Sequence, residues 1–528
     1  MGIYPHSAGL HPLNNSMSFW QNVSSMSENL DRKNGRKSSI TPNKAVVIGS
    51  GFGGLAAAIR LQAKGYETTI LEMRDKPGGR AYVYEDKGFT YDAGPTIITI
   101  PQIFTELAEI AGKRLEDYVT IVPCDPYYRI YFDDDTHFDY RGGDAELEAE
   151  IERVSPDDVE GYRRFAAYSS KVFDRAYTDL ADYAFDSVWD MIKVSPDLMK
   201  LRADRSVFKT VSRYIKSHKL RQVFSFEPLL IGGNPLRSSS IYSMIHHLEK
   251  TWGVHFAMGG TGALVAGLVK MFEEIGGKIQ LNTKVAEIEV HGGQVKSVRT
   301  ERGQVFPADV VVSNADVANT YRKLIKPEHR RKWTDRRIEK MKYAMSLVVV
   351  YFGTDRKYEQ LPHHSIVLGP RYEGLLTDIF DKKIVADDFS LYLHRPTATD
   401  PSLAPQGCDC FYVLSPVPHL GGGQDWDKIG EEYSEKILAS LEKPYLAPDL
   451  RKHIVSKRIF TPKNFETDLD AYMGSAFQFE PLLTQSAWFR PHNRSEDVEG
   501  LFFVGAGTHP GAGLPGVVNS AKVLERFL

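Results

Sequence analysis

Periodic apolar positions divide the chain into segments that predict a mixed α/β fold. Near the start, the apolar run Val46–Ile48 leads into the glycine-rich stretch GSGFGG. Apolar residues at spacings of three and four over residues 53–64 then predict a helix, and Thr68–Leu71 predicts a second strand. A strand, a glycine turn, a helix and a second strand in this order are typical of one unit of a parallel α/β sheet.

The rest of the chain also contains both predicted helices and predicted strands. Interleaved apolar and charged residues over 146–252 predict a mainly helical region. Apolar periodicity predicts a helix over residues 262–275, and strands are predicted at 279–281, 285–290, 295–300, 310–313, 345–353, 390–393 and 410–414. His291-Gly292-Gly293 supplies a hairpin turn. The last residues, from 500 onward, predict a strand, a long glycine-rich loop and a terminal helix.

The first glycines have the spacing of a dinucleotide site. Gly49 permits the tight turn, Gly51 permits close approach of a pyrophosphate, and Gly54 lets the helix pack on the strand. Glu72 follows about twenty residues later at the end of the next strand, where an acid binds a ribose hydroxyl. This motif predicts a nucleotide cofactor but does not distinguish FAD from NAD.

Two further glycine-rich stretches bear on that choice. Gly78-Gly79-Arg80 combines close backbone approach with a cation suited to phosphate, although a surface turn would have the same composition. The C-terminal loop carries Gly505, Gly507, Gly511, Gly513 and Gly516. If the first and last units hold one extended cofactor, a flavin fits better than a nicotinamide.

Composition and charge argue mainly against certain classes of protein. The 528 residues carry a formal net charge of -3, which does not favour a nucleic-acid binder. Cys124, Cys408 and Cys410 match no disulfide framework or metal motif, so we expect a reducing, cytoplasmic compartment. No apolar run reaches the ~18 residues of a membrane span. Residues 1–43 are rich in Ser, Asn and Gly and predict a disordered extension.

Several long blocks resemble the bacterial and fungal-type phytoene desaturases, which are FAD-dependent and related in fold to amine oxidases. They include GSGFGGLAAAIRLQAKGYETTILEMRDKPGGRAYVYEDKGFTYDAGPT, WGVHFAMGGTGALV, GSAFQFEPLLTQSAWFRPHNR and FVGAGTHPGAGLPGV, in the family's order from about Lys44 to Leu528. The resemblance implies an α/β fold. The implied fold has a Rossmann-type FAD-binding domain, a discontinuous α+β substrate domain and a helical membrane-associating part.

The implied domains and cofactor residues follow from this resemblance. The FAD-binding part covers residues 44–140, 256–320 and 490–528, the helical part 141–255, and the substrate domain 321–489. The residues implied to hold FAD are Gly49, Gly51, Gly54, Glu72, Gly79, Arg80, Gly94, Pro95, Thr96, Val285, Gly505, Gly507, Gly516 and Val517. Related amine oxidases often carry an acid where this chain has Ala506, which leaves the ribityl contacts open.

The resemblance implies successive dehydrogenations of phytoene towards lycopene, with a hydride passing to flavin N5 and a proton to a base or water. Asp190 is the candidate base, because it lies among apolar residues and matches an acid of the family; a capping or ion-paired role is the alternative. Oxygen and a quinone both remain possible electron acceptors, and the oligomeric state stays open. Rival activities are a carotenoid ketolase or isomerase, or an amine oxidase.

A substrate that resides in the bilayer implies a peripheral membrane protein. Arg202, Arg205, Lys209, Arg213 and Lys216 have helical spacing beside the apolar residues Leu201, Phe208, Val211 and Ile215. This pattern predicts an interfacial helix on anionic lipid, with a solvated face of a core helix as the alternative.

The histidine pairs were the remaining candidates for metal ligands. His246-His247 and His363-His364 lack a third ligand at metal spacing, and His509 lies in the glycine-rich loop as a neighbour of the cofactor. We therefore expect no metal site.

Overall fold

The computed structural model describes residues 43–528. The predicted disordered extension, residues 1–43, lies outside this range except for its last residue. A parallel five-stranded sheet has the order β19-β13-β1-β2-β9, with β1 at Lys44–Ile48, β2 at Glu67–Leu71, β9 at Lys278–Gln280, β13 at Val310–Ser313 and β19 at Leu501–Phe503. The fold therefore joins strands that are more than 400 residues apart in sequence.

Helices pack against this sheet through small and aliphatic side chains. In α2 (Phe52–Ala63), the alanines at 56–58 and their neighbours Leu55 and Ile59 are fully buried. α2 packs against α3 (Gln102–Ile110), α10 (Gly260–Glu274) and α17 (Leu514–Leu524). These contacts confirm the predicted helices at both ends of the chain.

A three-stranded antiparallel sheet follows β9. It consists of β10 (Val285–His291), β11 (Gln294–Thr300) and β12 (Val305–Pro307). Gly292 and Gly293 form the predicted hairpin turn, and both have positive φ, which glycine adopts without strain.

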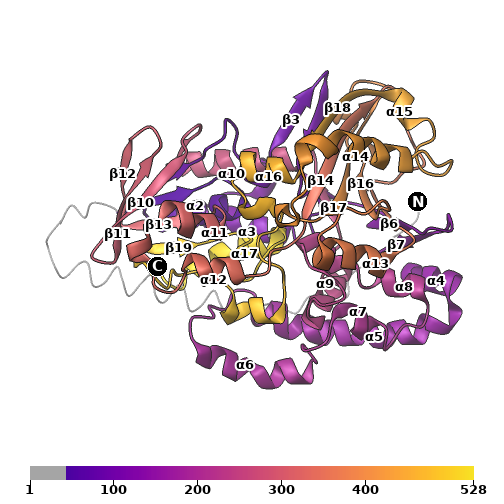
Figure 1. Cartoon of the computed structure of the whole chain (residues 1–528), viewed down its shortest axis with the longest axis horizontal. Helices are drawn as coiled ribbons and strands as arrows, with labels where there is room; N and C mark the ends of the chain where they lie inside the picture. Colours follow the sequence, from indigo (N-terminus) through magenta and orange to yellow (C-terminus); the bar gives the residue numbers. More distant parts are fainter. Residues whose placement is uncertain (1–42) are drawn as a thin grey trace, which may run out of the picture. The chain divides into compact units, whose positions relative to one another are not determined.

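The second large sheet has seven strands in the order β18-β14-β17-β16-β15-β6-β7 (Figure 1). Its strands are β6 (Tyr128–Tyr131), β7 (His137–Tyr140), β14 (Ser346–Thr354), β15 (His364–Val367), β16 (Leu391–His394), β17 (Asp409–Val417) and β18 (Ile454–Phe460). β14 is buried at every position, as its apolar sequence predicts. Two small ladders, β3 (Val83–Asp86) with β4 (Phe89–Asp92) and β5 (Ile121–Pro123) with β8 (His255–Ala257), complete the strands.

The helical region predicted at 146–252 is present and occupies the lower part of Figure 1, below the seven-stranded sheet. It contains α4 (Asp144–Val154), α5 (Val159–Phe173), α6 (Val188–Lys200), α7 (Val207–Val211), α8 (His218–Val223) and α9 (Met244–Trp252). The remaining helices are α11 (Val317–Asn319), α12 (Asp335–Lys340), α13 (Tyr372–Thr377), α14 (Trp426–Ser440), α15 (Leu450–His453) and α16 (Pro462–Leu469).

The predicted interfacial helix across residues 201–216 is wrong. α6 ends at Lys200, Arg202 adopts a left-handed conformation with φ 56°, and α7 has only five residues. Val211 and Ile215, assigned to an exposed apolar stripe, are at most 1% exposed and belong to the core. The basic residues have helical spacing in the sequence, but the backbone between residues 201 and 216 leaves the helical path twice, once before α7 and once after it.

None of the helices in residues 43–528 is both long enough and apolar enough to cross a membrane.

Candidate functional site

One cavity of about 460 Å³ lies where the glycine-rich segments meet the seven-stranded sheet. Its lining combines residues of the first, middle and last parts of the chain. Of the predicted cofactor residues, Gly49, Gly51, Glu72, Gly79, Arg80, Gly94, Pro95, Thr96, Val285, Gly505, Gly516 and Val517 line it. Gly54 and Gly507 do not, and neither does Asp190.

The turn between β1 and α2 is built for a close backbone approach. Gly49 has φ +91°, a conformation that disfavours other side chains. A Cβ on Gly54 would lie 2.0 Å from the Gly49 carbonyl oxygen, so Gly54 allows the helix to contact the turn, as predicted. The N-terminus of α2 has no side-chain cap and no acid in its first turn. Its free N–H groups suit an anion such as a pyrophosphate.

Glu72 is buried at the end of β2, and its carboxylate is already oriented by protein donors. Oε2 accepts hydrogen bonds from the Ser50 backbone N–H at 2.8 Å and the Ser50 hydroxyl at 2.6 Å. Oε1 accepts one from the Arg74 N–H at 2.9 Å. An ionised carboxylate can accept more than three hydrogen bonds, so it retains capacity for a ribose hydroxyl.

Arg80 brings a cation into the cavity. Its Nε donates to the Ala476 carbonyl at 2.8 Å, while Nη2 is buried without a hydrogen-bond partner in residues 43–528. Burial lowers the pKa of this guanidinium, and Asp316 nearby opposes that effect. A buried donor without a partner is costly, so Nη2 fits an anionic or hydrogen-bond-accepting ligand.

Gly507, predicted to line the cofactor, contacts a neighbouring side chain. A Cβ at Gly507 would lie 2.0 Å from Oε1 of Gln478. Gln478 lines the cavity, and its Oε1 accepts a hydrogen bond from the Val317 N–H at 3.1 Å. Gly507 therefore leaves room for the Gln478 side chain, which lines the cavity, and does not itself line it.

Asn314 is a cavity residue to which the sequence analysis gave no role. It follows β13 and contacts glycines of the first and the last glycine-rich segments: added Cβ atoms at Gly51, Gly53 and Gly505 would lie 2.7–2.9 Å from its side-chain amide. A polar residue directly after a buried strand at the carboxyl edge of the sheet was the available signal.

A large part of the cavity lining, which we call the apolar wall, is aliphatic and aromatic. Leu347, Val349 and Tyr351 alternate along β14, so their side chains share one face of the sheet. On β17, Leu414 pairs with Val349 and Tyr412 with Tyr351, which extends the same wall. Further apolar lining residues are Leu229, Leu230, Ile231, Phe460, Phe465, Leu469 and Phe477. This wall suits a long hydrocarbon.

The hydroxyl groups on this wall make hydrogen bonds within the protein. Thr96 Oγ1 lies 2.6 Å from the Tyr412 hydroxyl and 3.2 Å from that of Tyr392. The Tyr351 hydroxyl donates to the Ala93 carbonyl at 2.8 Å. Because these polar atoms are satisfied within the protein, they leave the wall predominantly hydrophobic.

Asp190 caps the N-terminus of α6. Its Oδ2 accepts a hydrogen bond from the Ser187 N–H at 3.0 Å, and the Ser187 side chain completes a capping box. Its Oδ1 accepts one from the Tyr183 hydroxyl at 2.8 Å, and Lys193 Nζ lies 4.0 Å away. These contacts give the carboxylate a structural role, and its acid–base role stays a prediction.

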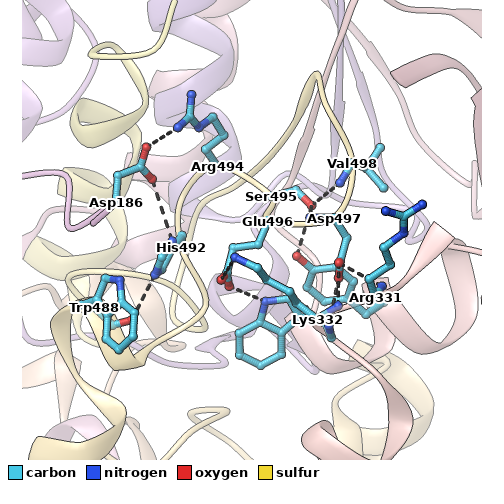
Figure 2. Close-up of polar contacts among 12 residues, drawn as sticks. Asp186, Arg331, Lys332, Trp488, His492, Arg494, Ser495, Glu496, Asp497 and Val498 are labelled. Carbon is cyan, nitrogen blue, oxygen red and sulfur yellow. Dashed lines mark hydrogen bonds and ion pairs between the residues drawn. The ribbon is translucent and has the colours of Figure 1, made fainter. Parts of the chain in front are cut away.

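The segment leading into α6 is anchored to the C-terminal part of the chain (Figure 2). Asp186 lies at 2.5 Å from Arg494 and at 3.9 Å from His492. In the same loop, the Asp497 carboxylate accepts hydrogen bonds from the backbone N–H groups of Arg331 and Lys332. The Asp186 contacts therefore tie the segment before α6 to this loop, and the Asp497 contacts tie the loop to residues 331 and 332.

Two of the candidate histidines are buried hydrogen-bonding residues. His246 contacts the hydroxyls of Tyr140 and Tyr162, and burial lowers its pKa to about 3. His509 lies 3.1 Å from the Leu180 carbonyl through Nε2. Both belong to the packing of the helical part.

Residues 52–523 match the family model described as flavin containing amine oxidoreductase. The chain is 54% identical over 486 residues to the phytoene desaturase (lycopene-forming) of Pseudescherichia vulneris, covering 92% of this chain and 99% of that protein. It is 44% identical over 491 residues to the phytoene desaturase (neurosporene-forming) of Rhodobacter capsulatus, covering 92% and 94%.

Solved structures share the fold at lower sequence identity. The crystal structure of an oxidoreductase from Methanosarcina mazei superposes with a TM-score of 0.61 at 18% identity, covering 92% of this chain and all of that one. This likeness establishes the arrangement of sheets and helices.

Proposed function

The chain belongs to the flavin-containing amine oxidoreductase family, and we propose that it catalyses the FAD-dependent desaturation of phytoene towards lycopene. The observation that carries this proposal is a single cavity with a glycine-lined end suited to a dinucleotide and a wall of aliphatic and aromatic side chains. The family establishes the flavin, and the apolar wall favours a hydrocarbon substrate.

The residues at the glycine-lined end fit FAD. The α2 N-terminus and the unpartnered Arg80 Nη2 provide donors for its phosphates, and Glu72 provides an acceptor for a ribose hydroxyl. When bound, FAD supplies the acceptor for hydrogen removed from the substrate. The chain's own part is to position that substrate and exclude water.

The apolar wall distinguishes a carotenoid from an amine. A bound ammonium group needs a carboxylate or several acceptors, because an unpaired buried charge is very costly. The cavity-lining side chains on β14 and β17 are aliphatic or tyrosine, with no acid among them. The acids that line the cavity, Glu72, Asp316 and Asp470, lie outside these two strands, so this wall favours a hydrocarbon over an amine. A ketolase or isomerase is distinguished by its product.

We propose that α6 is the membrane-docking element. Val188, Trp189, Ile192 and Met199 are 45%, 66%, 51% and 68% exposed, unusual for such large apolar residues. Val188, Ile192 and Met199 share one helix face, with Trp189 beside them. Lys193 and Lys200 lie on the flank of this face and are well exposed. An apolar face flanked by lysines is typical of a helix lying in an anionic membrane surface.

Vesicle co-sedimentation tests this docking element. Replacing Trp189, Ile192 and Met199 with Ser should greatly reduce binding to vesicles that contain anionic lipid, because each loss removes buried apolar area. A matched control replaces three exposed apolar residues elsewhere, Val305, Ile384 and Val455, with Ser. If both triple variants bind the vesicles as strongly as the parent protein, α6 is not the docking element.

Expression in cells that accumulate phytoene tests the proposed reaction. The colourless substrate should give way to coloured polyenes, with lycopene as the main product. A ketolase would instead yield oxygenated carotenoids, and an amine oxidase would leave phytoene unchanged. The electron acceptor, oxygen or a quinone, is identified by supplying each to the purified protein in the absence of the other.

A further inference from the structure

A buried cluster of nitrogen and sulfur donors lies behind the apolar wall. Cys124 follows β5, His363 precedes β15, and His364 begins β15. One potential ligand atom from each of these three residues lies within 4.8 Å of the other two. All three side chains are at least 95% buried.

The fold assembles this cluster from distant parts of the sequence. The Cys124 N–H donates to the Val254 carbonyl at 2.8 Å, which fixes the end of β5 next to β8. His364 pairs with His394 across the antiparallel β15–β16 ladder. The two consecutive histidines at the start of β15 therefore reach the same point as a cysteine about 240 residues earlier. No short sequence motif unites the three residues.

One ring nitrogen of the cluster and one of the neighbouring His394 lack partners. His364 Nε2 and His394 Nδ1 are buried and have no hydrogen-bond partner in the part of the chain that the structure describes. A buried polar atom without a partner is costly, so His364 Nε2 is suited to a ligand.

The Nδ1 atom of each cluster histidine lies close to a hydroxyl oxygen. His364 Nδ1 lies 2.7 Å from the Tyr392 hydroxyl, and His363 Nδ1 lies 2.6 Å from Thr399 Oγ1. Metal-binding histidines usually make such a contact through the nitrogen that does not coordinate, because it fixes the ring orientation. His363 Nε2 lies 3.0 Å from His394 Nε2, which places a third imidazole beside the cluster.

We propose that Cys124, His363 and His364 bind a transition-metal ion of the zinc class. Thiolate and imidazole ligands suit zinc. Binding converts the Cys124 thiol to a thiolate and releases its proton to solvent. The ion would clamp the end of β5 to β15 and, through Tyr392, hold the apolar wall in place.

Metal analysis of the purified protein with its bound flavin tests this proposal. Elemental analysis should find about one zinc per chain, and Co²⁺ added to metal-depleted protein should give a thiolate-to-cobalt charge-transfer band. Cys124→Ser and His364→Gln should each lose the metal and the band. Cys408→Ser removes a half-buried cysteine that is not in the cluster and should keep both.

Two results would overturn the proposal. One is a protein that contains no metal and gives no cobalt band, which would make the cluster a set of neutral hydrogen-bonded side chains. The other is metal that persists at full stoichiometry in Cys124→Ser and His364→Gln. Flavin content and thermal unfolding of each variant show whether it has folded. If a variant fails to fold, zinc and cobalt binding by the parent protein still decide the question.

Discussion

Three protein donors converge on the carboxylate of Glu72, so its orientation does not depend on a ligand. Glu72→Gln keeps the shape and removes the charge. A charge-assisted hydrogen bond contributes about 1.5–3 kcal/mol, so FAD affinity should fall by about 10- to 100-fold. Flavin titration of the FAD-depleted protein measures the change.

Glu85→Gln is the matched control for this prediction, because Glu85 is an exposed glutamate on β3 that does not line the cavity. It should leave FAD affinity unchanged. Parental affinity in Glu72→Gln would place the ribose elsewhere.

Asp190 is the residue for which the sequence and the structure point to different roles. Its contacts predict that Asp190→Ala lowers the free energy of unfolding by about 1 kcal/mol through loss of the helix cap. Ser187→Ala removes the same capping box without removing a carboxylate, and should have a similar effect on denaturant unfolding.

The two variants together separate the roles of Asp190. If the carboxylate only caps α6, both variants retain phytoene conversion once folded. An acid–base role would lower conversion by about 10²-fold or more in Asp190→Ala but not in Ser187→Ala, with flavin content unchanged in both.

At the scale of single elements, α9 carries a buried acid whose titration affects stability. The Glu249 carboxylate accepts a hydrogen bond from the Tyr128 hydroxyl at 2.6 Å, and burial raises its pKa to about 7. The folded chain therefore holds this proton more tightly than the unfolded chain, whose glutamates titrate near 4.5. The contribution of Glu249 to stability falls as pH rises from about 4.5 to 7, by at most about 1.4 kcal/mol per pH unit.

Glu249→Gln removes this contribution because the amide does not titrate. Unfolding by denaturant at several pH values should show a flatter decline between pH 5 and 7 than in the parent. Glu160→Gln, at an exposed position of α5, should keep the parental slope. A slope that is the same in Glu249→Gln and the parent would contradict the raised pKa.

The sequence predicted elements whose local pattern and tertiary packing agree. The β1–α2–β2 unit and the buried strand β14 appear within two residues of their predicted bounds, because their apolar periodicity matches the faces they bury. The helix predicted from the spacing of basic residues between Arg202 and Lys216 is wrong. Side-chain spacing alone does not reveal that Arg202 adopts a left-handed conformation, which is incompatible with a continuous helix.

Contacts between segments that are distant in sequence could not be predicted from local sequence patterns. The glycine spacings and Glu72 located one end of the cavity, since that motif is local. The roles of Asn314 and Gln478, and the approach of Cys124 to His363, depend on how strands hundreds of residues apart pair. Local patterns do not encode those pairings.

For the whole molecule, the proposed function requires one cavity to accommodate a flavin and a hydrocarbon together. The most direct test supplies phytoene in liposomes to the FAD-depleted protein, with and without added FAD, and identifies the products by chromatography and absorption spectra. We predict that phytoene is consumed and lycopene accumulates only when FAD is present. Phytoene that remains unchanged in the presence of bound FAD, or conversion that proceeds without FAD, would contradict the account.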